Sequence, residues 1–120
     1  MPRDARAYLA DIVDACDAIA VAVHDLDLTG YERSRLVRSS VEREFIIIGE
    51  AIEALARAAP EAFDAITQAR RIVDFRNRLT HEYRTVDDAL VWAIVERDVP
   101  VVRRECTALI QRLSSEDTEG

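Results

Sequence analysis

The amino-acid sequence predicts an all-α fold, an antiparallel bundle of four to five helices. Apolar residues make up 49% of the 120 positions, and only three glycines and three prolines interrupt them. Alanine, leucine, arginine and glutamate dominate, and these residues favour helices. Apolar residues recur at steps of three and four, whereas the alternation typical of strands is hard to find. Short connections favour antiparallel neighbours.

The first predicted helix covers residues 3–25. Its apolar stripe consists of Leu9, Ile12, Cys16, Ile19 and Val23. Residues 27–30 are expected to form a turn, in which Gly30 is best able to adopt a left-handed conformation.

The second predicted helix covers residues 31–59 and ends before Pro60, which disfavours helix in the residue before it. It is apolar on two sides, so it is either central in the bundle or shared between the core and a partner. Gly49 costs about 1 kcal/mol in a helix interior relative to alanine, which indicates a close approach of another helix. Glu50 is either buried and paired or simply exposed.

Proline and acidic residues suit a short helix over residues 60–66. A third main helix is predicted over 68–80, with Ile72, Phe75 and Leu79 facing inward. Thr85 can cap the next helix. A break is expected at residues 98–100, before a last helix that ends near Leu113.

The chain is expected to form one domain over residues 1–113, followed by a frayed acidic tail over 114–120. Charges interrupt every apolar run before it reaches the length of about 20 residues needed to cross a bilayer. The first residues also lack the apolar stretch of a secretory signal. The cytoplasm is therefore the expected location, without membrane association.

The two cysteines, Cys16 and Cys106, are far apart in the sequence and belong to no Cys-x-x-Cys or His/Cys group. Cys16 lies on an apolar stripe, so it is predicted to be a reduced cysteine in the core. Because no set of metal ligands is recognisable, neither a metal nor another cofactor is predicted.

The net charge of −7 argues against a broad nucleic-acid-binding surface. All 16 basic residues are arginines, and they are locally concentrated at Arg70, Arg71, Arg76, Arg78 and Arg84. This balance favours a small, focused anion site. For the arginines outside the motif described next, a solvated helix face is the alternative.

Residues 75–83 carry the groups best suited to chemistry. Arg76 can hold a phosphate with two hydrogen bonds, and His81 can act as acid or base near neutral pH. Asn77 could bond the imidazole, the facing backbone or a substrate. Arg76 and His81 are about 140° apart around a helix, so they face one spot only if the helix ends near Thr80. Together these groups indicate binding or cleavage of a phosphodiester.

Metal-free RNA cleavage needs a base, an acid and a cation, and one imidazole does not readily serve as both base and acid. The other histidine, His24, is interpreted as a residue at the C-terminal end of the first helix. A symmetric homodimer would bring two copies of Arg76 and His81 together. The second apolar side of the long helix is where the interface is expected.

The pattern Arg76-x4-His81-Glu82-Tyr83 resembles the signature of HEPN-domain proteins, specifically the HepT-like toxin branch. Residues 47–51 and 75–79, with Val91-Trp92 and residues 98–100, are similar to that branch as well. The resemblance covers nearly the whole chain.

This resemblance implies a homodimeric, metal-independent endoribonuclease that is the toxin of a toxin–antitoxin pair. Arg76 and His81 would be the catalytic pair, and Asn77 a supporting residue. Tyr83 matches the tyrosine that a cognate minimal nucleotidyltransferase antitoxin modifies with AMP. The added charge and bulk would then block a phosphate site. Judged without the resemblance, Tyr83 is a packed aromatic residue.

Two other interpretations stay open. In the first, the chain is a non-catalytic module that binds nucleotide or presents substrate to a nucleotidyltransferase. In the second, Arg76 and His81 form a structural ion-pair network with Asp74, Glu82 or Glu50.

Overall fold

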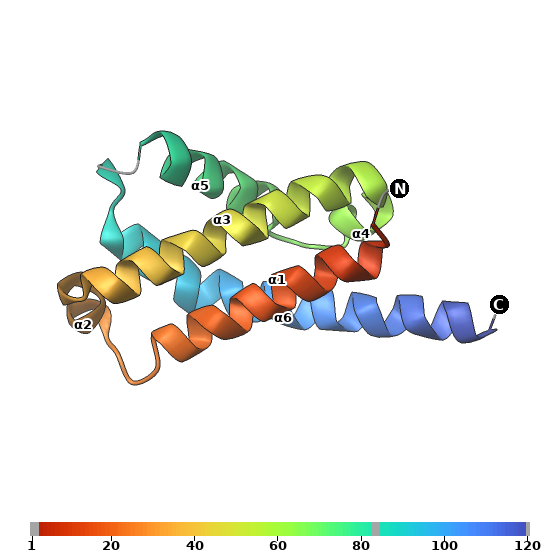
Figure 1. Ribbon diagram of the computed structural model, residues 1–120, viewed down its shortest axis with the longest axis horizontal. Helices are drawn as coiled ribbons and strands as arrows, with labels where there is room; N and C mark the ends of the chain where they lie inside the picture. Colours follow the sequence, from red (N-terminus) through yellow and green to blue (C-terminus); the bar gives the residue numbers. More distant parts are fainter. Residues whose placement is uncertain (1–2, 83–84, 120) are drawn as a thin grey trace.

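The computed structural model describes residues 3–82 and 85–119, and for 118 and 119 the backbone alone. The described residues form an all-α bundle, which confirms the predicted fold class (Figure 1). Its helices are α1 (Ala5–Ala22), α2 (Leu28–Arg33), α3 (Arg35–Ala58), α4 (Pro60–Asp64), α5 (Ala69–His81) and α6 (Asp88–Glu119). Within these residues no helix is both long and apolar enough to span a membrane.

Helix α3 is the centre of the bundle. It packs against α1 and α5 and also contacts α2 and α4, while α1 packs against α6. In Figure 1, α5 lies on one side of α3, and α1 and α6 lie on the other. The long helix is therefore central in the bundle, which is one of the two alternatives predicted for it. The fully buried residues of α3 are Val41, Phe45, Ile48, Ile52 and Leu55.

The predicted glycine turn after the first helix was wrong. Gly30 lies inside α2, and its N–H donates to Oδ1 of the N-cap residue Asp27 at 2.8 Å. The left-handed residue is Asp25, with φ 62°. A helix replaces the turn because Tyr31 is fully buried and packs on Trp92, with ring centroids 5.5 Å apart. Burial of this aromatic ring stabilises a helix that would be marginal alone.

The boundary predicted at Tyr31 was also wrong, because the chain breaks at Ser34. Ser34 is extended, and its hydroxyl accepts a hydrogen bond from the N–H of Val37 at 3.2 Å, so it caps α3. The prediction that the helix ends before Pro60 is confirmed, and Pro60 begins α4.

Two expectations for the last third of the chain were wrong. Asp87, not Thr85, caps α6, because its Oδ1 accepts from the N–H of Ala89 at 2.9 Å. The helix then continues through Pro100 to Glu119. A proline removes one helix hydrogen bond, but the neighbouring Val99 and Val102 are both buried in the core, and their packing holds the helix together.

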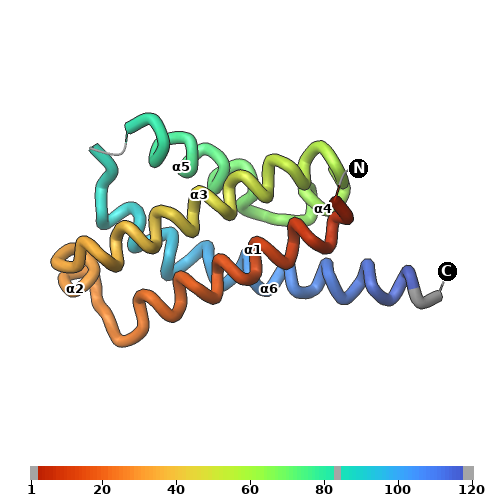
Figure 2. Tube along the Cα trace, viewed as in Figure 1, coloured from red at the N-terminus to blue at the C-terminus, as the bar shows by residue number. Residues whose placement is uncertain are grey.

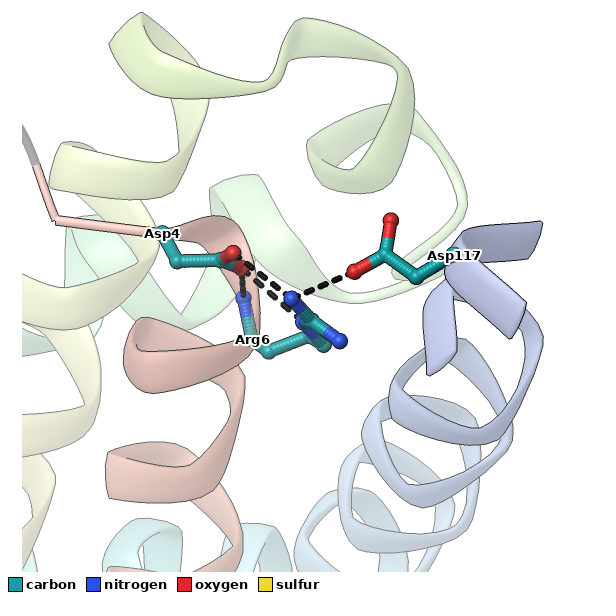
Figure 3. Close-up of polar contacts among 3 residues, drawn as sticks. All are labelled: Asp4, Arg6 and Asp117. Carbon is teal, nitrogen blue, oxygen red and sulfur yellow. Dashed lines mark hydrogen bonds and ion pairs between the residues drawn. The ribbon is translucent and has the colours of Figure 1, made fainter. Parts of the chain in front are cut away.

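The C-terminal part of α6 extends beyond the rest of the bundle (Figure 2). Residues 114–119, expected to be frayed, belong to this helix. Arg6 at the start of α1 lies between two carboxylates: its Nη2 is 2.9 Å from Asp4 and 2.6 Å from Asp117 (Figure 3). Hydrogen bonding to the Arg6 side chain lowers the pKa of Asp4 to about 2. The contact links the first and last helices at the surface.

Cys16 and Cys106 are free and buried, which confirms the core interpretation of Cys16. Burial raises the pKa of each thiol to about 12.

Candidate functional site

Helix α5 carries the motif and is anchored to α3 by its apolar face. Ile72, Phe75 and Leu79 are buried, as predicted. The ring of Phe75 meets the ring of Phe45 edge to face, with centroids 5.1 Å apart and planes at 89°. Edge-to-face packing is a favourable arrangement for two aromatic rings. The contact fixes the side of α5 that faces the core, and with it the position of Arg76.

Gly49 lets α5 approach α3 at Arg76. A Cβ atom at Gly49 would lie 2.5 Å from the Arg76 Cβ and 2.6 Å from its Cγ, closer than real Cβ atoms come to other atoms. The prediction that Gly49 marks a close helix approach is therefore confirmed. The stem of Arg76 occupies the space that any other side chain at position 49 would need.

The Arg76 guanidinium is buried and has two partners. Its Nη2 is 2.8 Å from Oε2 of Glu53 on α3, and its Nε donates to Oδ1 of Asn77 at 2.9 Å. Only 8% of the residue is exposed. A buried cation needs such partners, because an unpaired charge in the interior is strongly unfavourable. Arg76 is thus held in one place by α3 and by its own neighbour.

His81 lies elsewhere on the same helix. It is the last residue of α5, it is exposed, and Glu82 forms the C-cap. Because the helix is continuous from Arg76 to His81, the two residues point about 140° apart around its axis. The helix ends close to the predicted position near Thr80, but His81 is still its last residue and does not lie in the segment that leaves the helix. Within one protomer Arg76 faces α3 and His81 faces the solvent.

Asn77 and Thr80 make local hydrogen bonds near the end of α5. Asn77 was predicted to bond the imidazole, the facing backbone or a substrate; in the described structure its Oδ1 accepts from the Nε of Arg76. The Thr80 hydroxyl donates to the carbonyl oxygens of Arg76 at 3.3 Å and Asn77 at 3.0 Å. Through the Asn77 bond the Arg76 guanidinium is oriented by its own neighbour.

Other residues of the predicted site lie apart from Arg76 or outside the described residues. Glu50 was predicted to be either buried and paired or exposed, and it is exposed. Glu82 lies 3.8 Å from the Nε of Arg78, on the surface. The acidic partner of Arg76 is Glu53, which was not among the three predicted carboxylates. Tyr83 and Arg84 fall outside the described residues, so the predicted modification site has no structural description.

The predicted arginine-rich spot is divided between two sides of α5. A hollow of about 360 Å³ between α3, α4 and α5 includes Arg70, which lies over the ring of Phe63 at 5.5 Å. A second hollow of about 430 Å³, toward α6, includes Arg71 and Arg78. Arg71 also pairs with the buried Asp98 of α6 at 3.2 Å. A single focused anion site that uses all these arginines is therefore absent from the described part of one protomer.

The first hollow adjoins the Arg76 pair, because Glu53 is one of its walls. Its lining residues are Glu53, Ala56, Arg57, Phe63, Arg70, Val73 and Asp74. Sequence reasoning missed Glu53, although a signal was available: it lies four residues after Gly49, on the same face of α3. The glycine that predicts a close approach therefore also predicts which neighbouring side chain can reach the approaching helix.

The described residues thus form an all-α bundle in which one helix, α5, carries the buried Arg76 and the exposed His81. Residues 12–109 match the family described as ribonuclease HepT-like, and the chain belongs to this family. The chain is thus a HepT-like HEPN-domain protein.

Three relatives of this chain are similar over nearly their whole length. One, "Putative RNase MJ1380" of Methanocaldococcus jannaschii, is 32% identical over 86% of this chain and 94% of its own. "Putative RNase MJ0125" of the same organism is 27% identical, over 92% and 95%. "Probable ribonuclease HepT" of Thermococcus cleftensis is 26% identical, over 86% and 93%. No solved structure matches the chain.

Proposed function

We propose that this protein is a metal-independent endoribonuclease, the toxin of a toxin–antitoxin pair, that acts on RNA as a homodimer. The observation that carries the proposal is the family match over residues 12–109, which includes Arg76 and His81. The names of its relatives, which refer to RNases, point to the same substrate. In the described structure, Arg76 is a fixed cation and His81 an accessible imidazole on one helix.

Cleavage of RNA by an internal hydroxyl requires three groups. A base removes the 2′-hydroxyl proton, an acid protonates the departing 5′-oxygen, and a cation stabilises the negative charge that develops on the non-bridging phosphoryl oxygens. In the proposed mechanism His81 transfers protons and Arg76 stabilises the phosphorane. Asn77 supports the reaction indirectly, because it helps to orient the guanidinium.

A dimer would supply the second imidazole that one chain lacks. Arg76 and His81 of one protomer point in directions about 140° apart, and each protomer has only one histidine in the motif. A two-fold axis close to the end of α5 would bring the His81 residues of two protomers to the same phosphodiester. One imidazole could then act as base while the other acts as acid.

The first experiment measures RNA cleavage by the purified protein in EDTA. His81→Ala is expected to abolish cleavage, by at least about a hundredfold, because proton transfer contributes a factor of this order. His24→Ala is the matched control, since His24 is an exposed histidine just beyond α1 and should leave the rate unchanged. Both variants should remain dimers in sedimentation. Cleavage retained in His81→Ala would exclude the mechanism.

The second experiment concerns the proposed antitoxin, a minimal nucleotidyltransferase that transfers AMP to Tyr83. We expect co-expression with that partner to add AMP units to the intact mass of the protein and to suppress RNA cleavage. Tyr83→Phe should lose the added mass, whereas the control Tyr8→Phe should keep it. An unchanged pattern of added mass in Tyr83→Phe would place the modification elsewhere.

A second candidate function is a non-catalytic module that binds nucleotide for a partner nucleotidyltransferase. One observation favours it: the net charge of −7 argues against a broad surface for RNA. A dimer that binds nucleotide yet leaves RNA intact would support this alternative.

A further inference from the structure

The ion pair between Arg76 and Glu53 is unequal in exposure. The Arg76 side chain is 9% exposed, whereas that of Glu53 is 42% exposed. Arg76 is also held from both sides, by the contact of its stem with Gly49 and by the bond of its Nε to Asn77. Glu53 is the member of the pair that can move, because its side chain is partly exposed to solvent. It also lines the hollow between α3, α4 and α5.

The hollow beside Glu53 offers positive charge to an incoming anion. Arg57 of α3 and Arg70 of α5 both line it. A phosphate that enters would be attracted by these exposed arginines before it reached Arg76. Two carboxylates, Glu53 and Asp74, also line the hollow and oppose this attraction. In the described conformation, these two carboxylates therefore repel an anion that approaches the buried Arg76 guanidinium.

A phosphate and Glu53 compete for the same nitrogen. Two-point binding of phosphate uses two adjacent N–H groups of a guanidinium. The Nη2 of Arg76 is 2.8 Å from the Glu53 carboxylate, so an anion gains full access to it only when that carboxylate leaves. Arg57 gives Glu53 an alternative partner, because it lies four residues later on α3. Acid followed by base at this spacing is a favourable helix pair.

We propose that Glu53 is a displaceable counter-ion. In the resting protein it keeps the Arg76 guanidinium oriented and covered, and when a phosphate group binds at Arg76 it turns toward Arg57. The inference rests on the proposed function in that the phosphate would belong to the RNA substrate. Glu53 is then a positioning residue that sets the affinity for the substrate phosphate through Arg76.

The test measures the affinity of the full-length protein for inorganic phosphate by calorimetric titration. Glu53→Gln keeps an oxygen that can accept from Arg76 but removes the competing charge. Its Kd for phosphate is expected to fall by about fivefold, which is the order of a partly exposed ion pair. The matched control is Glu61→Gln on α4, which removes one exposed charge outside the hollow and should leave the Kd unchanged. In Arg76→Ala the Glu53→Gln change should have no effect.

Several results would overturn the inference: an unchanged Kd in Glu53→Gln, or a decrease that persists when Arg76 is absent. If Glu53→Gln does not fold, an NMR titration of the native protein with phosphate tests the same inference. Phosphate titration should shift the NMR signals of the Arg76 Nε and of the Glu53 carboxyl carbon together, and a stationary Glu53 signal would reject displacement.

RNA cleavage separates this inference from the proposed function. If the protein cleaves RNA, Glu53→Gln should lower KM by a similar factor, whereas a merely structural role would raise KM or lower kcat. If the protein binds phosphate as described but does not cleave RNA, the nuclease proposal fails and the counter-ion role of Glu53 stands. If RNA is cleaved with an unchanged KM in Glu53→Gln, the counter-ion role fails alone.

Discussion

At the scale of single residues, the contact between Gly49 and Arg76 decides where the motif arginine lies. Arginine has a long side chain, and a helix–helix contact does not normally accommodate one. Here the stem passes where the facing helix has no side chain, and the guanidinium reaches Glu53 one turn further along α3. The burial of a permanently charged group therefore depends on one glycine and one carboxylate.

Gly49→Ala is expected to destabilise the protein by about 1–2 kcal/mol. Alanine favours a helix by about 1 kcal/mol over glycine, but overpacking against atoms close to the α5 backbone typically costs 1–3 kcal/mol or more. We expect overpacking to dominate, because the Cβ and Cγ of Arg76 are not the free end of a flexible side chain.

Urea unfolding measures this change, with Gly30→Ala as the matched control. At Gly30 a new Cβ would lie 3.1 Å from the Leu26 Cδ2, a side-chain atom that can adjust. The control should therefore change stability much less. A Gly49→Ala variant as stable as the native protein would show that α5 can shift away from α3 without loss.

The sequence singles out Arg76 and His81 as candidates because the motif depends on local spacing. It did not identify Glu53, because that residue meets Arg76 through tertiary packing of α3 on α5, and several acidic residues lay at plausible distances. The partners considered for Asn77 did not include Arg76, because a side-chain bond between immediate neighbours leaves no periodic signal in the sequence.

At the scale of helices, apolar periodicity predicted the main elements and failed where caps and short helices decide the boundaries. Ser34 and Asp87 interrupt or begin helices through single hydrogen bonds from their side chains, and periodicity does not register such bonds. At Pro100 the error was the reverse, because a helix break was predicted where the helix continues. A proline normally ends a helix, but here the burial of its neighbours Val99 and Val102 outweighs the hydrogen bond it removes.

Asp27→Ala is expected to lower the stability of the protein by about 1 kcal/mol, the typical contribution of an N-cap carboxylate. Asp27 caps α2, which has only six residues and holds the fully buried Tyr31. Thermal unfolding measures the effect. Asp14→Ala, at an exposed position inside α1, is the control and should be neutral or slightly stabilising. A loss of the same size in both variants would indicate that the cap is not the cause.

At the scale of the whole molecule, the end of α5 and the C-terminal part of α6 lie at opposite ends of the bundle (Figure 1). The contact of Arg6 with Asp117 ties the projecting part of α6 to the start of α1. Changes in the last turns of α6 should therefore affect His81, at the end of α5, only through the overall stability of the fold.

Both native thiols are buried, and their raised pKa values leave them almost entirely protonated at neutral pH. A thiol placed at the end of α5 by His81→Cys would consequently be the one that reacts with a maleimide spin label, without any need to remove Cys16 or Cys106. Electron paramagnetic resonance could then read the separation of two such labels across an assembled pair. The buried native thiols thus leave the label at position 81 as the reporter that tests whether two protomers assemble as proposed.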